Sequence, residues 1–285
     1  MNTSVNNESS VSFFTNCYEG DWEEVLKTDR LKSMITNCGI DFFERNLIIN
    51  NVKNRSEVES FAKKAVEENV IDRYYFSGDY ETEIFKAFSI KRTDFVLDFH
   101  DGYWYSMGPL AAIFLCRSKY MIYFTCDCMI PAGSSSAWIN KAIALFESTP
   151  SICVANPIWE YNKEKARTES FNEDEEWFYG YGFSDQCFLI ETKRFYGDVY
   201  NYYHISSEIF PMYGGNPFER MINSYMRSEK LTRITNKNIH YTHEKLINPN
   251  SDLSKPKFSF KKMIKRKAGF VTRKIRIRIK RIFNL

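Results

Sequence analysis

The segment Tyr120–Asp127, YMIYFTCD, decides the fold. It is the most hydrophobic stretch of the chain, and it ends at an acidic residue. A continuous apolar run that does not alternate with polar residues is typical of a central strand in a parallel sheet, which is covered on both faces. Ligands of such sheets bind at the carboxyl ends of the strands. We therefore expect Asp127 to stand at the binding edge of a buried sheet.

Asp127 has two interpretations at that position. A carboxylate there can hold a divalent cation, which in turn neutralises a diphosphate. An aspartate can also simply open a turn, or cap a helix near Pro131. The position alone does not choose between the two, although a carboxylate beside so apolar a strand is costly to bury unless it binds something.

Outward from this strand, short apolar runs alternate with helical patterns. Strands separated by helices form right-handed βαβ units, so the alternation predicts an α/β protein with a mainly parallel, Rossmann-like sheet flanked by helices. A capping box of Ser56 and Glu59 starts one helix, and Gly108-Pro109 and Ser136 start two others. The predicted strands are 11–16, 46–51, 72–77, 120–126 and 151–155, and the predicted helices are 21–36, 57–69, 109–119 and 137–148.

The second half of the chain changes character. Residues 160–180 are polar and acidic, which predicts a long loop or lid. A strand at 185–191 and a helix at 217–229 follow, and the stretch 232–243 ends in a strand that contains two histidines.

Polar side chains follow the first two predicted strands, namely Thr15, Asn16 and Asn51. The carboxyl ends of parallel strands meet at one edge, so these residues are expected near Asp127. His240 and His243 point to opposite faces of a strand and make a poor ligand pair. One of them can still be a ligand, whereas a single histidine more often has a structural role.

Two further carboxylates have both a structural and a functional interpretation. Glu219 follows Asn216-Pro217, so it can bond back to a helix cap, or it can act as a base at a helix start. Asp185 in GFSDQ is either a turn residue or a carboxylate that faces an acceptor. Motifs of P-loop enzymes, dinucleotide oxidoreductases and most serine hydrolases are missing from the sequence.

The order of these elements resembles glycosyltransferases of the GT-A fold, similar to the bacterial enzymes that build surface polysaccharides. The resemblance covers about residues 11–245 and follows element order rather than close identity. It is carried, in chain order, by FFTNCYEGDW, LIINN, the GPLAA helix that leads into YMIYFTCD, GYGFSDQCFLIE, NPFERMINSYMR and IHYTH.

The resemblance implies a nucleotide-sugar donor, and Mn²⁺ or Mg²⁺ held by the strand-end aspartate. The matching stretch Thr125–Met129 has one aspartate, Asp127, where the family has two. A late histidine completes the metal site in some members, which matches His243.

The family's first two strand ends hold the nucleotide, and they map to Thr15, Asn16 and Asn51. In inverting members a carboxylate near the acceptor is the base. Asp185 and Glu219 both match that position, and the resemblance leans toward inversion.

The charge of the chain is divided between its parts. Residues 255–285 hold 13 basic and no acidic residues, which leaves 26 basic against 36 acidic residues in 1–254. We expect a catalytic domain over 1–254, with a donor half at about 11–157 and an acceptor half at about 158–254. The basic tail at 255–285 is expected to bind an anionic membrane surface. A solvated charge run is the simpler alternative for this tail.

The acidic body argues against nucleic-acid binding. The start MNTSVNNESS is not of signal-peptide type, and no apolar run reaches the ~20 residues that span a bilayer. We therefore expect a cytoplasmic protein, peripheral on the inner face of the membrane, that acts on a saccharide or lipid-linked saccharide in surface polysaccharide synthesis. The sequence predicts no oligomeric state.

Two alternatives of other classes stay open. A sugar nucleotidyltransferase also uses a parallel sheet and a carboxylate-bound Mg²⁺, although the EGDWEE stretch after the first strand is acidic where that class needs a basic loop. A non-catalytic module that binds membrane or nucleic acid is the other, and the missing second aspartate favours it.

Overall fold

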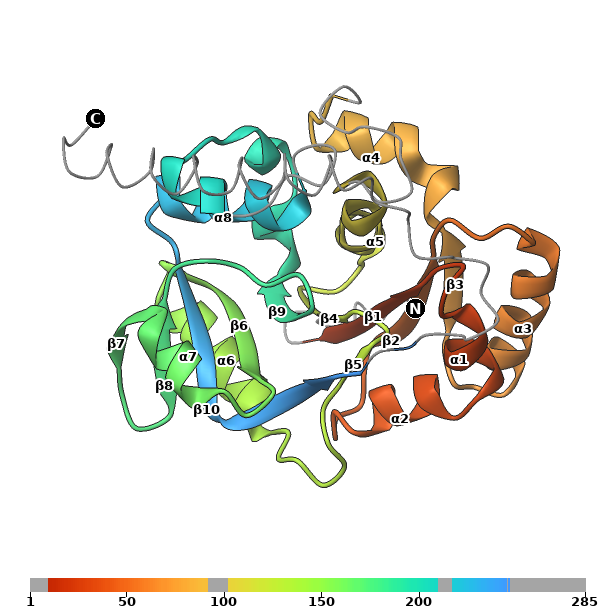
Figure 1. Ribbon diagram of the computed structural model, residues 1–285, viewed down its shortest axis with the longest axis horizontal. Helices are drawn as coiled ribbons and strands as arrows, with labels where there is room; N and C mark the ends of the chain where they lie inside the picture. Colours follow the sequence, from red (N-terminus) through yellow and green to blue (C-terminus); the bar gives the residue numbers. More distant parts are fainter. Residues whose placement is uncertain (1–9, 92–101, 210–216, 245, 247–285) are drawn as a thin grey trace, which may run out of the picture.

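The computed structural model describes residues 10–91, 102–209, 217–244 and 246. Within these residues, ten strands form one mixed sheet of the order β3-β2-β1-β4-β9-β6-β10-β8-β7, in which the short β5 pairs with β10 beside this path (Figure 1). The strands are β1 (Val11–Cys17), β2 (Glu44–Ile49), β3 (Arg73–Phe76), β4 (Tyr120–Phe124), β5 (Cys128–Met129), β6 (Ile152–Trp159), β7 (Ser170–Glu173), β8 (Trp177–Gly180), β9 (Cys187–Glu191) and β10 (Thr232–His243).

The first four strands of this order run parallel, as the sequence predicts. β1 lies between β2 and β4, and β3 extends the sheet beyond β2. All five residues of β4 are buried, which confirms that its hydrophobic run is a central strand. The carboxyl ends of these strands therefore meet at one edge, where Asp127 follows β4.

The second half of the sheet is mixed, so the prediction of a mainly parallel sheet is correct only for the first half. β9 runs antiparallel to both β4 and β6, and β10 is parallel to β6 but antiparallel to β8. Parallel neighbours need a long crossover, usually a helix, whereas β7 and β8 are joined by residues 174–176 alone and pair antiparallel.

The prediction of a long loop or lid over 160–180 is wrong. This stretch forms a short helix and the antiparallel pair β7–β8. Aromatic residues explain the difference, because Trp177 and Phe178 of β8 are buried. Their burial stabilises a strand that the surrounding acidic residues obscure in the sequence.

Side chains alternate between two hydrophobic cores, one on each face of the sheet. Phe13 and Ile122 belong to one core and Phe14 and Met121 to the other, as the period of two requires. Helices α1, α2, α3 and α6 contribute to the first core, and α4, α5 and α8 to the second. The α-helices are α1 (Trp22–Lys27), α2 (Arg30–Thr36), α3 (Arg55–Glu67), α4 (Glu81–Ala87), α5 (Gly102–Leu115), α6 (Ala137–Ser148), α7 (Lys163–Thr168) and α8 (Phe218–Ser228).

Short 3₁₀ segments complete the described secondary structure. They are η2 (Ser77–Tyr80), η4 (Thr192–Phe195), η5 (Asp198–Asn201) and η6 (Ile205–Ile209). η5 and η6 lie between β9 and α8 in the chain, and they pack beside α8 in the second core.

Three predicted helices differ from the structure. The predicted helix 21–36 is broken, because Thr28 is extended with φ −121° and ψ 177° between α1 and α2. The cap of α3 is Asn54, which accepts the Glu57 N–H, rather than Ser56. α5 begins six residues before Gly108, with Pro109 inside it. Gly108 instead permits close packing, since a Cβ there would lie 2.8 Å from the Tyr123 hydroxyl.

The predicted basic tail at 255–285 lies outside the described residues, and so does Asn216, the expected cap of α8. Among the residues that are described, no helix has both the length and the apolar character that a membrane crossing needs.

Candidate functional site

A tight turn after β4 places Asp127 at the edge of the sheet. The Thr125 N–H donates to the Gln186 carbonyl at 2.8 Å, and the Cys128 N–H donates back to the Thr125 carbonyl at 2.9 Å. The turn therefore stops β4 and turns the chain into β5. The Asp127 side chain is half-buried there, with 31% of its surface exposed.

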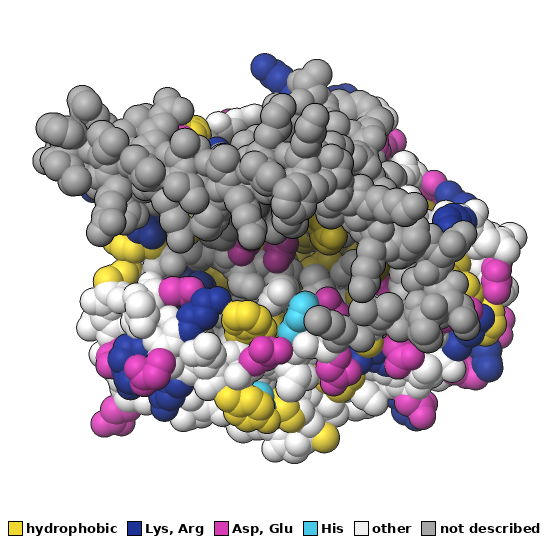
Figure 2. Space-filling view, viewed as in Figure 1, with side chains coloured by type: hydrophobic (Ala, Val, Ile, Leu, Met, Phe, Trp, Pro, Cys, Tyr) yellow, Lys and Arg dark blue, Asp and Glu magenta, His cyan; other side chains and the backbone are white. Residues whose placement is uncertain are grey.

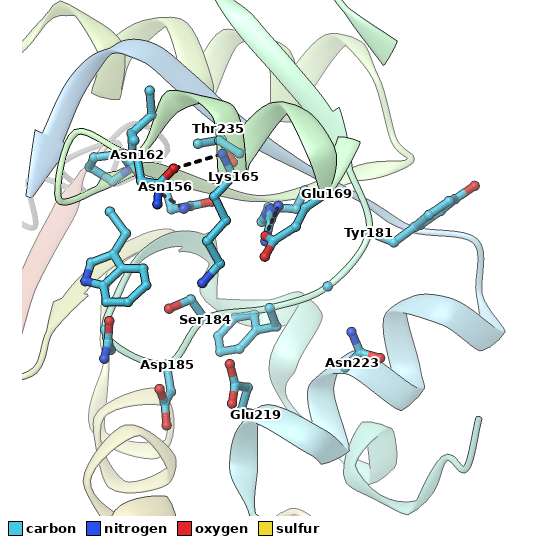
Figure 3. Close-up of a pocket in the computed structure, with 18 of the residues that line it drawn as sticks. Asn156, Asn162, Lys165, Glu169, Tyr181, Ser184, Asp185, Glu219, Asn223 and Thr235 are labelled. Carbon is cyan, nitrogen blue, oxygen red and sulfur yellow. Dashed lines mark hydrogen bonds and ion pairs between the residues drawn. The ribbon is translucent and has the colours of Figure 1, made fainter. Parts of the chain in front are cut away.

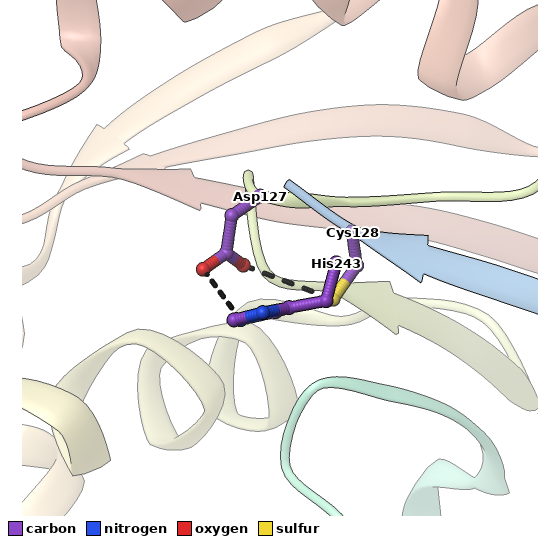
Figure 4. A group of neighbouring side chains, drawn as sticks. All are labelled: Asp127, Cys128 and His243. Carbon is purple, nitrogen blue, oxygen red and sulfur yellow. Dashed lines mark hydrogen bonds and ion pairs between the residues drawn. The ribbon is translucent and has the colours of Figure 1, made fainter. Parts of the chain in front are cut away.

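The end of β10 brings His243 to the same turn. His243 pairs with Cys128 in the antiparallel ladder of β10 and β5, and the next residue, Glu244, donates its N–H to the Asp127 carbonyl at 2.8 Å. His243 Nε2 lies 2.9 Å from Asp127 Oδ2, as Figure 4 shows. Two residues 116 positions apart in the sequence thus meet at one point.

Cys128 adds a sulfur atom to this pair. Its thiol lies 3.7 Å from Asp127 Oδ1, and the ligand atoms of Asp127, Cys128 and His243 all lie within 4.8 Å of one another. Burial raises the pKa of this thiol well above its ordinary value, and the Asp127 charge adds to the effect. We name these three residues the strand-end cluster.

Cys126, two residues before Cys128, points elsewhere. Its thiol donates to Asp21 Oδ2 at 2.8 Å, while Asp21 Oδ1 accepts the Tyr18 N–H at 2.7 Å. Asp21 is only 4% exposed. Burial raises its pKa to about 7, and the Cys126 and Tyr18 hydrogen bonds oppose that rise. The sequence gives no signal that the Asp21 carboxyl group is buried.

The residues predicted to hold the nucleotide lie at the ends of β1 and β2. Asn16 is half-buried and accepts the Tyr123 hydroxyl at 2.9 Å. Asn51 has a left-handed backbone with φ 49°, and its carbonyl accepts the Glu19 N–H at 3.3 Å. Thr15 is fully buried, so its side chain offers no exposed surface to a ligand.

A pocket of about 970 Å³ opens beside this edge. β6 and α7 form one wall, and the 181–186 segment and the start of α8 form another (Figure 3). Asp185 and Glu219, both predicted as candidate bases, line this pocket together. Figure 2 shows acidic side chains and a histidine gathered at the hollowed centre of the same face.

The electrostatics of the two carboxyl groups differ. Burial, aided by the neighbouring Asp127 charge and opposed by His243, raises the pKa of Asp185 to about 6. Burial raises the pKa of Glu219 well above its ordinary value, and the Asp185 charge adds to it. Both shifts favour the protonated, uncharged form of these carboxyl groups.

The opposite wall of the pocket supplies cations and aromatic surface. The Lys165 ammonium lies 4.3 Å from the Trp159 ring centroid and extends from α7 into the pocket (Figure 3). Arg233 of β10 is buried, and its Nη2 donates to Glu169 at 3.4 Å. Lys165 and Glu169 come from the stretch 160–180 that was predicted to be a loop, and Arg233 comes from β10.

His240 does not join the strand-end cluster. Its ring centroid lies 3.4 Å from that of Tyr161, and burial lowers its pKa. Of the two histidines on β10, only His243 reaches Asp127.

Comparisons with known proteins give likenesses in structure but none in sequence. No protein-family model matches the chain, and no curated protein sequence matches it. A solved structure described as the crystal structure of GalNAc-T7 with UDP, GalNAc and Mn²⁺ is 11% identical, with a TM-score of 0.49. The match covers 84% of this chain and 44% of that one, so the chain spans less than half of its length. A likeness at this level assigns no role to any residue here.

Proposed function

We propose that this chain is a glycosyltransferase that moves a sugar from a nucleotide-sugar donor to a saccharide acceptor. One observation carries the proposal. Asp127 and His243 meet at the carboxyl end of the central strand, directly beside a pocket that holds two carboxyl groups of raised pKa. Perturbed titratable groups gathered in a pocket favour a catalytic site over a structural one.

The strand-end cluster fits a divalent cation. Asp127 Oδ2 and His243 Nε2 lie 2.9 Å apart, and the Cys128 thiol adds a third donor within 4.8 Å. Oxygen, nitrogen and sulfur donors together suit Mn²⁺ and softer first-row metals better than Mg²⁺, which prefers oxygen alone. When bound, the cation would neutralise the charge that develops on the departing nucleoside diphosphate.

Asp185 is our candidate for the base that takes the acceptor proton. A general base must be ionised at the working pH, and a pKa of about 6 satisfies this while keeping the carboxylate basic. Glu219 lines the same pocket, and it is our candidate for orienting the acceptor by hydrogen bonding. A carboxylate base on the acceptor side supports direct displacement with inversion.

The pocket is suited to a saccharide in size and surface. A cavity of about 970 Å³ lies at the upper end of the range for small-molecule sites. Trp159 is 36% exposed and offers a flat apolar face on which a sugar ring can stack. Asn16 and Asn51, at the ends of β1 and β2, are our candidates for contacts to the nucleotide.

The acceptor and the cellular setting are further proposals that rest on the sequence. The resemblance to surface-polysaccharide enzymes supports a lipid-linked saccharide acceptor. The 13 basic residues of 255–285 support binding to an anionic membrane surface. Deleting 255–285 should abolish sedimentation with vesicles that contain anionic lipid at moderate salt. Equal sedimentation of both proteins, or of neither, would contradict this part.

The test of the activity compares Asp127→Asn with a matched carboxylate variant. Asp72→Asn removes an exposed carboxylate that pairs with Arg45 just before β3, at the opposite edge of the sheet. A panel of nucleotide sugars with Mn²⁺ is assayed for the released nucleotide product. We expect nucleoside diphosphate release from the wild type and Asp72→Asn, and its loss in Asp127→Asn. Formation of a nucleoside triphosphate and a sugar 1-phosphate, only when pyrophosphate is added, would instead indicate nucleotidyl transfer, and turnover in Asp127→Asn would refute the proposed site.

A further inference from the structure

Arg30 links the two segments that carry Asp127 and His243. It is the first residue of α2, a helix that packs in the same hydrophobic core as the strand-end turn. Its Nε donates to the Cys126 carbonyl at 2.6 Å, and its Nη1 donates to Glu244 at 2.6 Å. Cys126 precedes Asp127, and Glu244 follows His243. One side chain thus joins the residue before one candidate ligand to the residue after the other.

The burial of Arg30 makes this contact more than a surface ion pair. Its side chain is 5% exposed, whereas the side chain of Glu244 is 53% exposed. A buried guanidinium is costly unless its hydrogen bonds are made; both of those given above go to the strand-end segments, and Nη2 has no partner among the described residues. The planar group donates in two directions at once, which lysine cannot do in the same way.

Two neighbouring contacts complete the arrangement. The Glu244 N–H donates to the Asp127 carbonyl at 2.8 Å, and the Cys126 thiol donates to Asp21 at 2.8 Å. Cys126 is therefore held at its carbonyl by Arg30 and at its thiol by Asp21. Asp127, the next residue, has little freedom to move away from His243.

We propose that Arg30 is a positioning residue that holds Asp127 and His243 in register for a divalent cation. This inference rests on the proposed function, because it presumes that the strand-end cluster binds a cation. Within the described residues Arg30 hydrogen-bonds neither Asp127 nor His243, so it acts through the backbone of Cys126 and through Glu244.

The direction in which cation affinity changes when Arg30 is replaced distinguishes positioning from electrostatic repulsion. Arg30 carries a positive charge near a cation site, so removing that charge should strengthen cation binding if only through-space repulsion mattered. Loss of a positioning contact should instead weaken binding, and residues that orient metal ligands typically contribute about 10- to 100-fold in affinity.

The experiment measures Mn²⁺ affinity alone, from the electron paramagnetic resonance signal of free Mn²⁺ during titration of the full chain. Arg30→Met is expected to weaken binding about 10-fold or more, and Arg30→Lys to recover part of that loss. Arg117→Met is the matched control, because Arg117 pairs with the buried Glu44 at the start of β2, far from the cluster in the fold. It should lower the melting temperature without changing Mn²⁺ affinity.

The outcomes test the proposed metal site and the positioning role of Arg30 separately. If Asp127→Asn binds Mn²⁺ as the wild type does, the proposed metal site fails. If Asp127→Asn loses binding while Arg30→Met binds as well as the wild type or better, the positioning role is refuted and the metal site stands. Equal weakening in Arg30→Met and Arg117→Met would also refute it, since general destabilisation would then explain both. Should Arg30→Met not fold, Arg30→Lys decides, and unchanged affinity there overturns the inference.

Discussion

The buried carboxyl group of Asp21 predicts a specific dependence of stability on pH. Its pKa is raised from 3.8 to about 7, mainly by burial. Between these two values the folded protein holds a proton that the unfolded chain releases. The free energy of unfolding therefore falls as pH rises through this window, and it stays low above pH 7.

The magnitude follows from the size of the shift. Each unit of pKa difference corresponds to about 1.4 kcal/mol, so the window between pH 5 and pH 7 contributes about 3 kcal/mol. Asp21→Asn removes the titrating group and retains an amide oxygen that can accept the Tyr18 N–H. Relative to the wild type, this variant should become more stable by about 3 kcal/mol as the pH is raised from 5 to 8.

Urea unfolding followed by tryptophan fluorescence at pH 5, 6.5 and 8 measures this difference. Asp185 and Glu219 titrate in both proteins, so their effects cancel in the comparison. A stability difference between Asp21→Asn and the wild type that does not change with pH would refute the reasoning. It would mean that Asp21 is ionised in the folded protein throughout this range.

Three further predictions concern the site. Activity of the wild type should rise as pH increases through about 6, because Asp185 must lose its proton to act as base. Asp185→Asn should lower kcat by about 100-fold or more. A pH profile of activity that is flat between 5 and 8 would contradict this role. Trp159→Ala should raise KM for the acceptor with kcat little changed, since stacking contributes to binding rather than to the reaction, and steady-state kinetics with varied acceptor checks it. Cys128→Ser should weaken Zn²⁺ binding more than Mn²⁺ binding, because a thiolate favours softer cations, and equal losses by calorimetry would exclude sulfur as a ligand.

The parallel half of the fold was predictable because its signals are local. The apolar run of β4 and the amphipathic pattern of α3 are each visible within about a dozen residues, whereas the caps were misplaced. The stretch 160–180 was not predictable in the same way. Its strands depend on burying Trp177 and Phe178 against distant residues, and tertiary packing there overrides the acidic composition.

The site was predictable only in part, for a related reason. Asp127 stands out because it interrupts a hydrophobic strand, and His243 was matched through the resemblance. Arg30 carries no such signal, since its partners lie 96 and 214 positions away and one of them is a backbone carbonyl. Asp21 is equally hidden, because nothing in EGDW indicates that this acidic residue is buried.

The central claim is that Asp127 and His243 jointly bind the cation that holds the donor's diphosphate. The most direct measurement is anomalous diffraction at the manganese edge from crystals grown with Mn²⁺ and the nucleoside diphosphate that most raises the melting temperature. We expect an anomalous peak in contact with both Asp127 and His243, beside the diphosphate. A nucleotide bound elsewhere, or a manganese peak that touches neither residue, would contradict it.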